Sequence, residues 1–310
     1  MLKFQPITPG VKVLADSYTF KYGEGSCQHS FVSSWTLRHK YADEFCEHEG
    51  YFYTLRKNLC TENERIYLFP HGPRDDEAAL THALQNILDD SHSHNARAKF
   101  QTVTESAKDI ITKLFPGRFN AELNRDWAEY IYSIESLSTY SGHELANKRR
   151  DFHRFERDYA GRAEARLITP EDLPLLWAFE DEWLRKKLAN LDDPSQEKYL
   201  MAEREAIGNS LKDWEMLGLT GIAAVIDGVI RGYAYGSRLS DDYIDEMCEK
   251  GDITFPNIYT FIRHEFARIC GAGMKYLNLE EDIGSRYLRT AKEYYKPAFL
   301  MNKYILTENE

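Results

Sequence analysis

The sequence of 310 residues has no run of about 18 apolar residues, the length that a membrane-spanning helix needs. Its first residues contain no basic segment followed by an apolar core, so they do not form a secretory signal. Acidic residues outnumber basic ones: the chain has 39 Lys and Arg and 50 Asp and Glu, which gives a net charge of −11. We therefore expect a soluble, cytoplasmic protein that is not a general binder of nucleic acids or anionic membranes.

Cysteine is sparse too. The chain has five, without short regular spacing: Cys27, Cys46, Cys60, Cys248 and Cys270. This argues against a disulfide framework and a structural zinc site, and it favours reduced thiols. The Walker A, His-Glu-x-x-His and Gly-x-Ser-x-Gly motifs are all absent. The sequence thus predicts no metal site and no bound cofactor.

The composition that is present, 43% hydrophobic and 29% charged residues, is typical of a globular protein. Hydrophobic periodicity and turn residues predict alternating helices and strands. The predicted helices are 1–16, 75–89, 104–115, 133–159 with a break near 141–142, 173–188, 195–217, 256–270 and 285–294. The predicted strands are 31–38, 50–56, 65–70, 124–132, 166–168, 221–226, 229–237, 243–250, 276–279 and 299–306.

The order of these elements predicts an α/β fold with mixed sheets. Each half of the chain has strands followed by a helix, a strand and a helix, although there is no sequence repeat. The clearest element is a β-hairpin at 221–237 with an Asp227-Gly228 turn. We predict two similar units, 1–160 and 161–310, with the helical stretch 133–159 between them.

Two cations of that helical stretch lie on its apolar stripe. Lys148 and Arg149 fall between Leu145 and Phe152, whereas helices normally place cations opposite the apolar face. An unpaired buried charge is costly, so both side chains need a partner. One explanation is structural: the side chains extend outward to solvent or pair with an acid. The other is functional: they form an anion-binding group that faces a cleft between the units.

Charges are also dense at the end of the strand 243–250. Glu249 and Lys250 are adjacent, so they point to opposite faces if the strand is regular. The pattern fits either an exposed strand end or a cleft.

A third cluster follows the strand 276–279. Its acids Glu280, Glu281 and Asp282 precede a helix that carries Arg286, Arg289 and Lys292 at spacings of three. The acids either cap the helix, or one of them is a general base or holds an ammonium group. The three cations share one helix side and can hold an anion.

Together these segments resemble a known family, soluble bacterial proteins related to the C-terminal domain of phosphatidylglycerol lysyltransferase. The resemblance covers roughly residues 15–306. The hairpin and the following positions carry it: Asp126, Tyr130-Ile131-Tyr132, Leu137, Gly142, Lys148-Arg149-Arg150, Phe152, Phe155, Glu249-Lys250, Asn278-Leu279-Glu280-Glu281-Asp282-Ile283-Gly284, Leu288-Arg289, Ala291-Lys292, Tyr295, Pro297 and Lys303-Tyr304. The Asn-Leu-Glu-Glu-Asp-x-Gly box is the most specific part.

The resemblance implies two tandem GNAT-like acyltransferase units, as in the Fem-like aminoacyl transferases. It also implies an aminoacyl-tRNA donor and an amine or hydroxyl acceptor. Two features depart from simpler relatives. The stretch 251–257, Gly-Asp-Ile-Thr-Phe-Pro-Asn, lacks the glycine-rich pyrophosphate loop of acetyl-CoA enzymes. The integral membrane region of the lipid-modifying relatives is also missing, which argues against a membrane lipid as acceptor.

The leading hypothesis is therefore an acyl or aminoacyl transferase. Its catalytic carboxylate is one of Glu249, Glu280, Glu281 and Asp282. Substrate is held by Lys148, Arg149, Lys250, Asn278, Arg286, Arg289 and Lys292. The alternative is a non-catalytic protein of the same fold that binds an amino acid or a small zwitterion. A third alternative is that these charges only join the two units.

Overall fold

The computed structural model describes residues 2–191 and 197–309. They form two compact units. Unit 1 contains Met1–Tyr130, Glu281–Arg289 and Phe299–Glu310, and unit 2 contains Ile131–Glu280 and Thr290–Ala298. This division differs from the predicted boundary near residue 160, because the chain enters unit 2 within a strand and later returns to unit 1.

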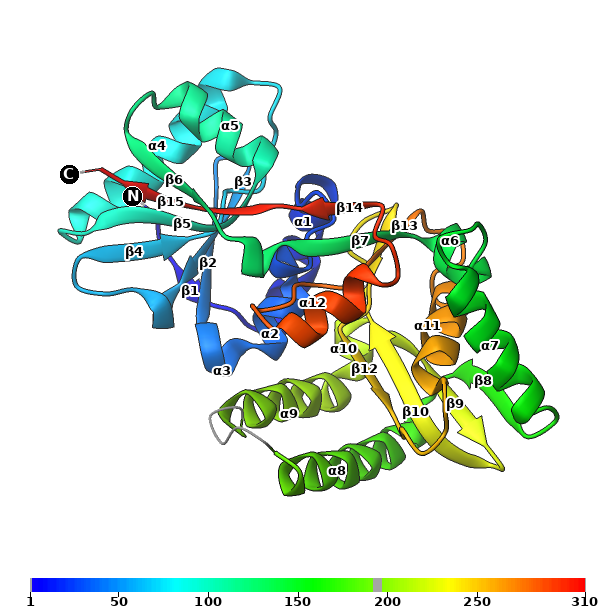
Figure 1. Cartoon of the computed structure of the whole chain (residues 1–310). Coiled ribbons are helices and arrows are strands. Elements are labelled where there is room, and N and C mark those ends of the chain that lie inside the picture. The colour runs from blue at the N-terminus through cyan, green and yellow to red at the C-terminus, as the bar shows by residue number, and fades with distance from the viewer. Residues whose placement is uncertain (1, 192–196, 310) are drawn as a thin grey trace. The chain divides into compact units, whose positions relative to one another are not determined.

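Unit 1 is built on a seven-stranded sheet with the order β1-β2-β3-β4-β5-β15-β6. β4 and β5 are parallel, and the other neighbouring strands are antiparallel. The last strand of the chain, β15, lies between β5 and β6 (Figure 1). The strands are β1 (Gln5–Pro6), β2 (Asp43–His48), β3 (Tyr51–Arg56), β4 (Glu64–Tyr67), β5 (Arg97–Thr104), β6 (Phe119–Leu123) and β15 (Lys303–Glu308).

The two faces of this sheet differ in character. One face packs Tyr51, Tyr53 and Leu55 into an apolar core with the helices α4 (Glu77–Ser93) and α5 (Glu105–Leu114). Successive strand residues point to opposite faces, so Phe52, Thr54 and Arg56 lie on the other face. The helix α1 (Lys12–Tyr22) covers that face, and its Tyr18 stacks on Phe52. The second face is thus partly polar.

The N-terminal region corrects two predictions. The predicted helix 1–16 is a short strand followed by α1, which begins only at Lys12. The predicted strand 31–38 is helical and forms α2 (Phe31–Thr36) and α3 (Arg38–Tyr41). The Ser30 hydroxyl oxygen accepts a hydrogen bond from the Ser33 amide, which caps α2. The capped segment is therefore helical and not extended as predicted.

Unit 2 has a four-stranded sheet with the order β12-β10-β9-β8. Its strands are β8 (Ala163–Leu167), β9 (Thr220–Ile226), β10 (Val229–Gly236) and β12 (Cys248–Gly251). The predicted hairpin is confirmed as β9 and β10. α8 packs on one face of the sheet and contacts α9, whereas α11 packs on the other face (Figure 1). Gly232 lets α11 approach, because a Cβ there would lie 2.5 Å from Ile262 Cδ1.

The helices of unit 2 follow the predicted pattern, including the break near 141–142, except that the predicted helix 195–217 is divided into two helices. They are α6 (Ile134–Thr139), α7 (Ala146–Asp158), α8 (Leu173–Ala189), α9 (Glu197–Lys212), α10 (Trp214–Leu217) and α11 (Ile258–Ile269). The start of the predicted helix 195–217 lies outside the described residues. Within the described part of the chain, no helix has both the length and the apolarity that crossing a bilayer requires.

Four further elements lie where the chain passes between the units. They are β7 (Glu129–Ser133), β13 (Tyr276–Asn278), α12 (Arg286–Glu293) and β14 (Phe299–Met301). The predicted extended segment 124–132 is a short 3-10 helix at Arg125–Trp127 followed by β7. In unit 2, β13 pairs with the short strand β11 (Tyr243–Asp245) and with β7.

Candidate active site

The candidate site forms where the chain changes partner between two strands of unit 2. The predicted single strand 243–250 is in fact β11, which pairs with β13, and β12, which pairs with β10. At the change, the Glu246 amide donates to the Asn278 carbonyl oxygen on β13 at 2.9 Å. A Cβ at Gly236 would lie 1.9 Å from the Asp245 carbonyl oxygen, so this crossing needs glycine. The break buries the Glu246 side chain inside unit 2.

Two carboxylates converge there on one guanidinium. Arg263 on α11 lies 3.3 Å from Glu246 Oε1, and its Nη2 also contacts Glu249 Oε2. Its guanidinium lies 4.4 Å from the ring centroid of Tyr295. Among the described residues, Glu246 Oε2, Glu249 Oε1 and Arg263 Nε are buried without a hydrogen-bond partner. Most buried polar atoms have partners, so these atoms can serve a ligand.

Lys148 of α7 completes the cluster. Its Nζ lies 3.8 Å from the ring centroid of Tyr295 and 4.5 Å from that of Tyr294. Within the described ranges it makes no ion pair, although it is half-buried. The aromatic rings partly stabilise the buried ammonium group. This ammonium group can still bind an anionic group of a ligand.

Burial controls protonation in this cluster. It raises the pKa of Glu249 to about 8, because the lowering effect of Arg263 only partly offsets it and Glu246 adds a raising effect. Burial raises the pKa of Glu246 as well. Burial and the charge of Arg263 lower the pKa of Lys148 to about 8. Groups with a pKa near the working pH can accept and release protons, so the cluster can perform acid–base chemistry.

The neighbouring Lys250 belongs to the opposite face of the same sheet, as predicted. Its side chain pairs with Glu203 of α9 at 2.9 Å, and its Nζ lies 3.6 Å from the ring centroid of Trp183. The buried Glu180 on this face accepts a hydrogen bond from the Tyr233 hydroxyl at 3.3 Å, and burial raises its pKa. Glu249 and Lys250 therefore do not form one group.

The acids of 280–282 also separate. In unit 1, Asp282 is fully buried and accepts hydrogen bonds from Arg289 Nε at 2.9 Å, the Tyr130 hydroxyl at 2.7 Å and Arg125 at 3.1 Å. Burial alone would raise the pKa of Asp282, but the hydrogen bonds outweigh it and lower the pKa to about 2. Glu281 accepts a hydrogen bond from Gln28 Nε2 at 2.9 Å. Two predicted site residues, Asp282 and Arg289, are thus neighbours, and they form an ion pair with each other.

The remaining predicted residues lie close, along the chain, to the points where it passes from one unit to the other. In unit 2, the fully buried Asn278 accepts a hydrogen bond from the Glu280 amide at 2.8 Å through its side chain. Lys292 Nζ donates to the Leu279 carbonyl oxygen at 2.6 Å. Arg286, in unit 1, is exposed on α12. Lys292 therefore joins two separate segments of unit 2, the end of β13 and the end of α12.

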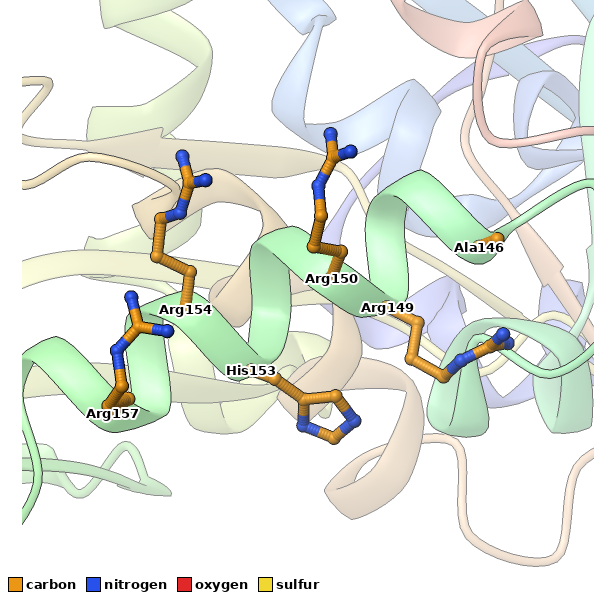
Figure 2. Close-up of a pocket in the computed structure, with 6 residues that line it drawn as sticks. All are labelled: Ala146, Arg149, Arg150, His153, Arg154 and Arg157. Atoms are coloured by element: carbon orange, nitrogen blue, oxygen red, sulfur yellow. The ribbon is translucent and has the colours of Figure 1, made fainter.

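Arg149 does not lie with Lys148. It donates to the carbonyl oxygens of Tyr140 at 2.6 Å and Gly142 at 3.1 Å, which closes the turn before α7. It also borders an open surface pocket lined by Ala146, Arg149, Arg150, His153, Arg154 and Arg157. Figure 2 shows three of these arginines, Arg150, Arg154 and Arg157, extending from one side of α7. We call these three the arginine row.

Sequence reasoning missed Glu246 and Arg263. A signal for Arg263 was present, because it is the first charged residue of α11 and follows the largely apolar run from Ile258 to Ile262. No comparable signal existed for Glu246, because its burial depends on the strand break.

The chain is similar to known proteins in both sequence and structure. The family model described as "Phosphatidylglycerol lysyltransferase, C-terminal" matches residues 19–307. An uncharacterized protein of Mycoplasmoides gallisepticum is 25% identical over 179 residues, which cover 57% of this chain and 55% of that protein. The matched part thus spans about half the length of that curated relative.

Solved structures share the fold. A protein of unknown function from Bacteroides thetaiotaomicron has a TM-score of 0.89 at 26% identity, and the match covers 100% of both chains. The C-terminal domain of a lysylphosphatidylglycerol synthetase from Agrobacterium fabrum has a TM-score of 0.67 at 14% identity, covering 98% of this chain and 93% of that one. L-PGS from Bacillus licheniformis has a TM-score of 0.64 at 14% identity, covering 96% and 91%. The predicted α/β fold class with mixed sheets is confirmed.

Proposed function

Because this chain belongs to the phosphatidylglycerol lysyltransferase C-terminal family, we propose that it is an aminoacyl transferase with its reaction centre in unit 2. Family and fold support acyl transfer. The observation that carries the proposal is the buried cluster of Glu246, Glu249, Arg263 and Lys148, where an acid and an amine both have a pKa near 8. The donor is an aminoacyl-tRNA, and the acceptor carries an amine or a hydroxyl.

The free atoms of the cluster match the groups of this reaction. The carboxylate form of Glu249, whose share grows as the pH rises toward its pKa of about 8, takes the proton of the acceptor at Oε1. The acceptor nitrogen or oxygen then attacks the ester carbonyl carbon. The Lys148 ammonium stabilises the oxyanion that forms. Collapse expels the ribose oxygen, which takes the proton back from Glu249. Glu246 Oε2, buried beside Arg263, accepts a hydrogen bond from the α-ammonium of the aminoacyl group.

The arginine row supports an RNA donor. Arg150 and Arg157 are 64% and 71% exposed, and among the described residues each pairs only with the carboxylate of the next residue along the chain. Exposed arginines at helical spacing can bind successive phosphates, and release of counterions then makes binding dependent on salt. The catalytic roles of Glu280, Glu281 and Asp282, and the substrate-binding roles of Arg149, Lys250, Asn278, Arg286, Arg289 and Lys292, stay predictions.

The test is single-turnover incubation of the purified protein with pools of labelled aminoacyl-tRNA, with and without small amines. We expect deacylation or transfer of at least one amino acid above the rate without protein. Glu249→Gln should lower that rate by a factor of roughly 100 or more. Glu182→Gln, an exposed acid on α8, should leave it unchanged. Absence of turnover with every charged tRNA would reject the proposal.

A second function, binding of a free amino acid, is favoured by the same unpartnered atoms. Glu246 Oε2 and Glu249 Oε1 fit an ammonium group, and Lys148 fits a carboxylate. In a thermal-shift screen, stabilisation by free amino acids without any turnover of aminoacyl-tRNA supports this binding function over the transferase.

A further inference from the structure

Tyr295 lies beside the cations of the reaction centre in unit 2, although it has no part in the chemistry proposed there. The residue is only 4% exposed and follows α12 in a turn. Its amide donates to the Lys292 carbonyl oxygen at 3.0 Å, and the Tyr132 hydroxyl donates to the same oxygen at 2.6 Å. The backbone at Tyr295 is therefore fixed to β7, which gives its ring a defined place.

The hydroxyl end of the Tyr295 ring is held as well. It lies 3.5 Å from the Thr260 hydroxyl of α11, and the ring of Tyr140 packs beside it with 6.2 Å between centroids. Burial raises the pKa of Tyr295 to about 12, so the residue is neutral near pH 8. Tyr295 therefore adds no charge to the cluster. It presents the electron-rich face of an aromatic ring.

Two cations share this ring. Lys148 Nζ lies 3.8 Å from its centroid, and the guanidinium carbon of Arg263 lies 4.4 Å from the same centroid. Like charges repel, and the charge of Arg263 is the second cause, after burial, that lowers the pKa of Lys148. Because a ring face attracts cations, the Tyr295 ring offsets part of this repulsion. The ring of Tyr294 adds less, since it is 4.5 Å from Lys148 Nζ and 45% exposed.

The carboxylates near Lys148 do not replace the ring. Asp151 and Glu249 raise the pKa of Lys148, but burial and Arg263 have larger effects. Asp151 lies 3.6 Å from Arg150, and Glu249 contacts Arg263. Among the described residues, neither acid forms an ion pair with Lys148. The ammonium group is therefore held beside an aromatic ring and not by a carboxylate.

We propose that Tyr295 is a positioning residue of the reaction centre, and that its ring holds the Lys148 ammonium beside Arg263, where the oxyanion forms. The inference rests on the proposed function, because Lys148 is the group that meets the oxyanion there. Tyr295 acts through Lys148 and does not itself take part in the reaction. A ring face stabilises the charge but accepts few hydrogen bonds, so the N–H donors of Lys148 stay available for an anion.

Stepwise fluorination of the ring tests this role, because fluorine weakens the attraction of the ring face for cations and changes the shape of the ring little. Tyr295→Phe is prepared first in the full-length protein, followed by the same variant with one, two or three fluorine atoms on the introduced ring. The pKa of Lys148 is measured by carbon-13 NMR of lysine labelled at Cε. Its resonance is assigned by its loss in Lys148→Arg.

We expect Tyr295→Phe to keep the wild-type pKa of Lys148, because the ring face remains. The pKa should then fall with each fluorine, by roughly 0.5–1 pH unit over the series, since a weaker ring face stabilises the ammonium form less. A constant pKa over the series would overturn the proposal. This measurement needs no substrate.

Phe155 is the matched control. It is a fully buried ring of α7 that, among the described residues, packs on the rings of Tyr159 and Phe261 and not on a cation. The same fluorine atoms at Phe155 should leave the pKa of Lys148 unchanged. Equal falls in the Phe155 and Tyr295 series would show that fluorination acts through packing, and this result would also overturn the proposal.

Single-turnover transfer from aminoacyl-tRNA then tests whether this position of Lys148 serves the reaction. At pH 8 the rate should fall roughly two- to fivefold over the Tyr295 series, because the share of Lys148 in the ammonium form falls by this factor from a pKa of about 8. The aminoacyl-tRNA concentration at half-maximal rate should stay within about twofold. An unchanged rate would overturn the positioning role. If the wild type transfers no aminoacyl group, the proposed function fails, and the pKa series still decides whether the ring holds Lys148.

Discussion

The pKa values of Glu249 and Lys148 are shifted mainly by one cause, the burial of both side chains. Burial disfavours the charged form of each group, so the pKa of the acid rises and the pKa of the amine falls until both reach about 8. Each shift is also a statement about stability, because the folded and unfolded chains then bind different numbers of protons.

The first prediction concerns Glu249→Gln. Between the unfolded pKa of about 4.3 and the folded pKa of about 8, folded Glu249 keeps a proton that the unfolded chain has released. The wild-type free energy of unfolding therefore falls as pH rises through this window, by on the order of 2–4 kcal/mol. The variant lacks this titration. Its stability relative to the wild type should increase from pH 5 to pH 8 in urea titrations.

Glu182→Gln is the control for that measurement, because Glu182 is exposed and its pKa is lowered by Arg185, so it does not titrate in this range. If the difference in free energy of unfolding between Glu249→Gln and the wild type did not change from pH 5 to pH 8, this would contradict the raised pKa of Glu249. It would also remove the main support for Glu249 as the proton acceptor.

Asp282 gives the second prediction, with the opposite sign. Its pKa is lowered to about 2, so its stabilising effect is present above the unfolded pKa and is lost as pH falls through about 2. Asp282→Asn should destabilise the protein by about 3 kcal/mol at pH 7, because it removes the buried negative charge that pairs with Arg289 and Arg125. The loss should shrink as the pH falls toward 2.

The measurement is urea unfolding at pH 7 and at pH 3, with Asp126→Asn as the control. Asp126 contacts Arg289 at 2.8 Å but is 57% exposed, so its replacement should change stability by less than about 1 kcal/mol. Unchanged stability together with lost transferase activity would instead return Asp282 to the catalytic role that the sequence predicted.

The sequence located individual charged residues of the site but not their grouping. Lys148 was found because a cation on an apolar stripe needs a partner, and in unit 2 it lies on Tyr295 beside Arg263. Arg149 met the same criterion yet binds backbone carbonyls. Periodicity shows which face of a helix a residue occupies. It does not show which segment, distant along the chain, supplies the partner.

At the scale of elements, predictions succeeded where local signals agreed. The Asp227-Gly228 turn fixed the hairpin, because φ is positive at both positions. The predictions failed where a non-local contact or a helix cap determined the structure of the segment. The strand 243–250 splits because its backbone changes partner from β13 to β10, and segment 31–38 is helical because Ser30 caps it. Neither cause can be read from hydrophobic alternation.

The third prediction concerns α7. Replacing the arginine row by glutamine, in the triple variant Arg150→Gln, Arg154→Gln and Arg157→Gln, should lower affinity for tRNA at least roughly tenfold at low salt. The slope of log affinity against log salt should fall by up to about 3. Stability should barely change, because the three side chains are exposed. Filter binding over a range of salt concentrations measures both effects.

A matched control exists on α8, where Arg185, Lys186 and Lys187 are also exposed. Changing these three residues to glutamine alters the net charge by the same amount. Equal losses in both triple variants would mean that tRNA responds to net charge alone, and that the arginine row is not its contact.

At the scale of the molecule, the element order predicted the fold class but not the path of the chain between the units. The C-terminal segments return to unit 1, where β15 lies between β5 and β6. β15 also supplies Lys303, the buried partner of Glu129. Local sequence patterns cannot show that a strand near residue 305 completes a sheet begun near residue 5.

This path gives the fourth prediction. A fragment of residues 1–160, the unit that the sequence predicted, lacks β15 and should not unfold cooperatively in urea. Its β6 would lose the strand beside it in the sheet, and Glu129 would be a buried charge without Lys303. Joining residues 1–130 to 299–310 through a flexible linker restores both contacts and should recover a cooperative transition in circular dichroism. Cooperative unfolding of the 1–160 fragment would show that β15 is dispensable, and it would favour the boundary at residue 160 over the one at Tyr130.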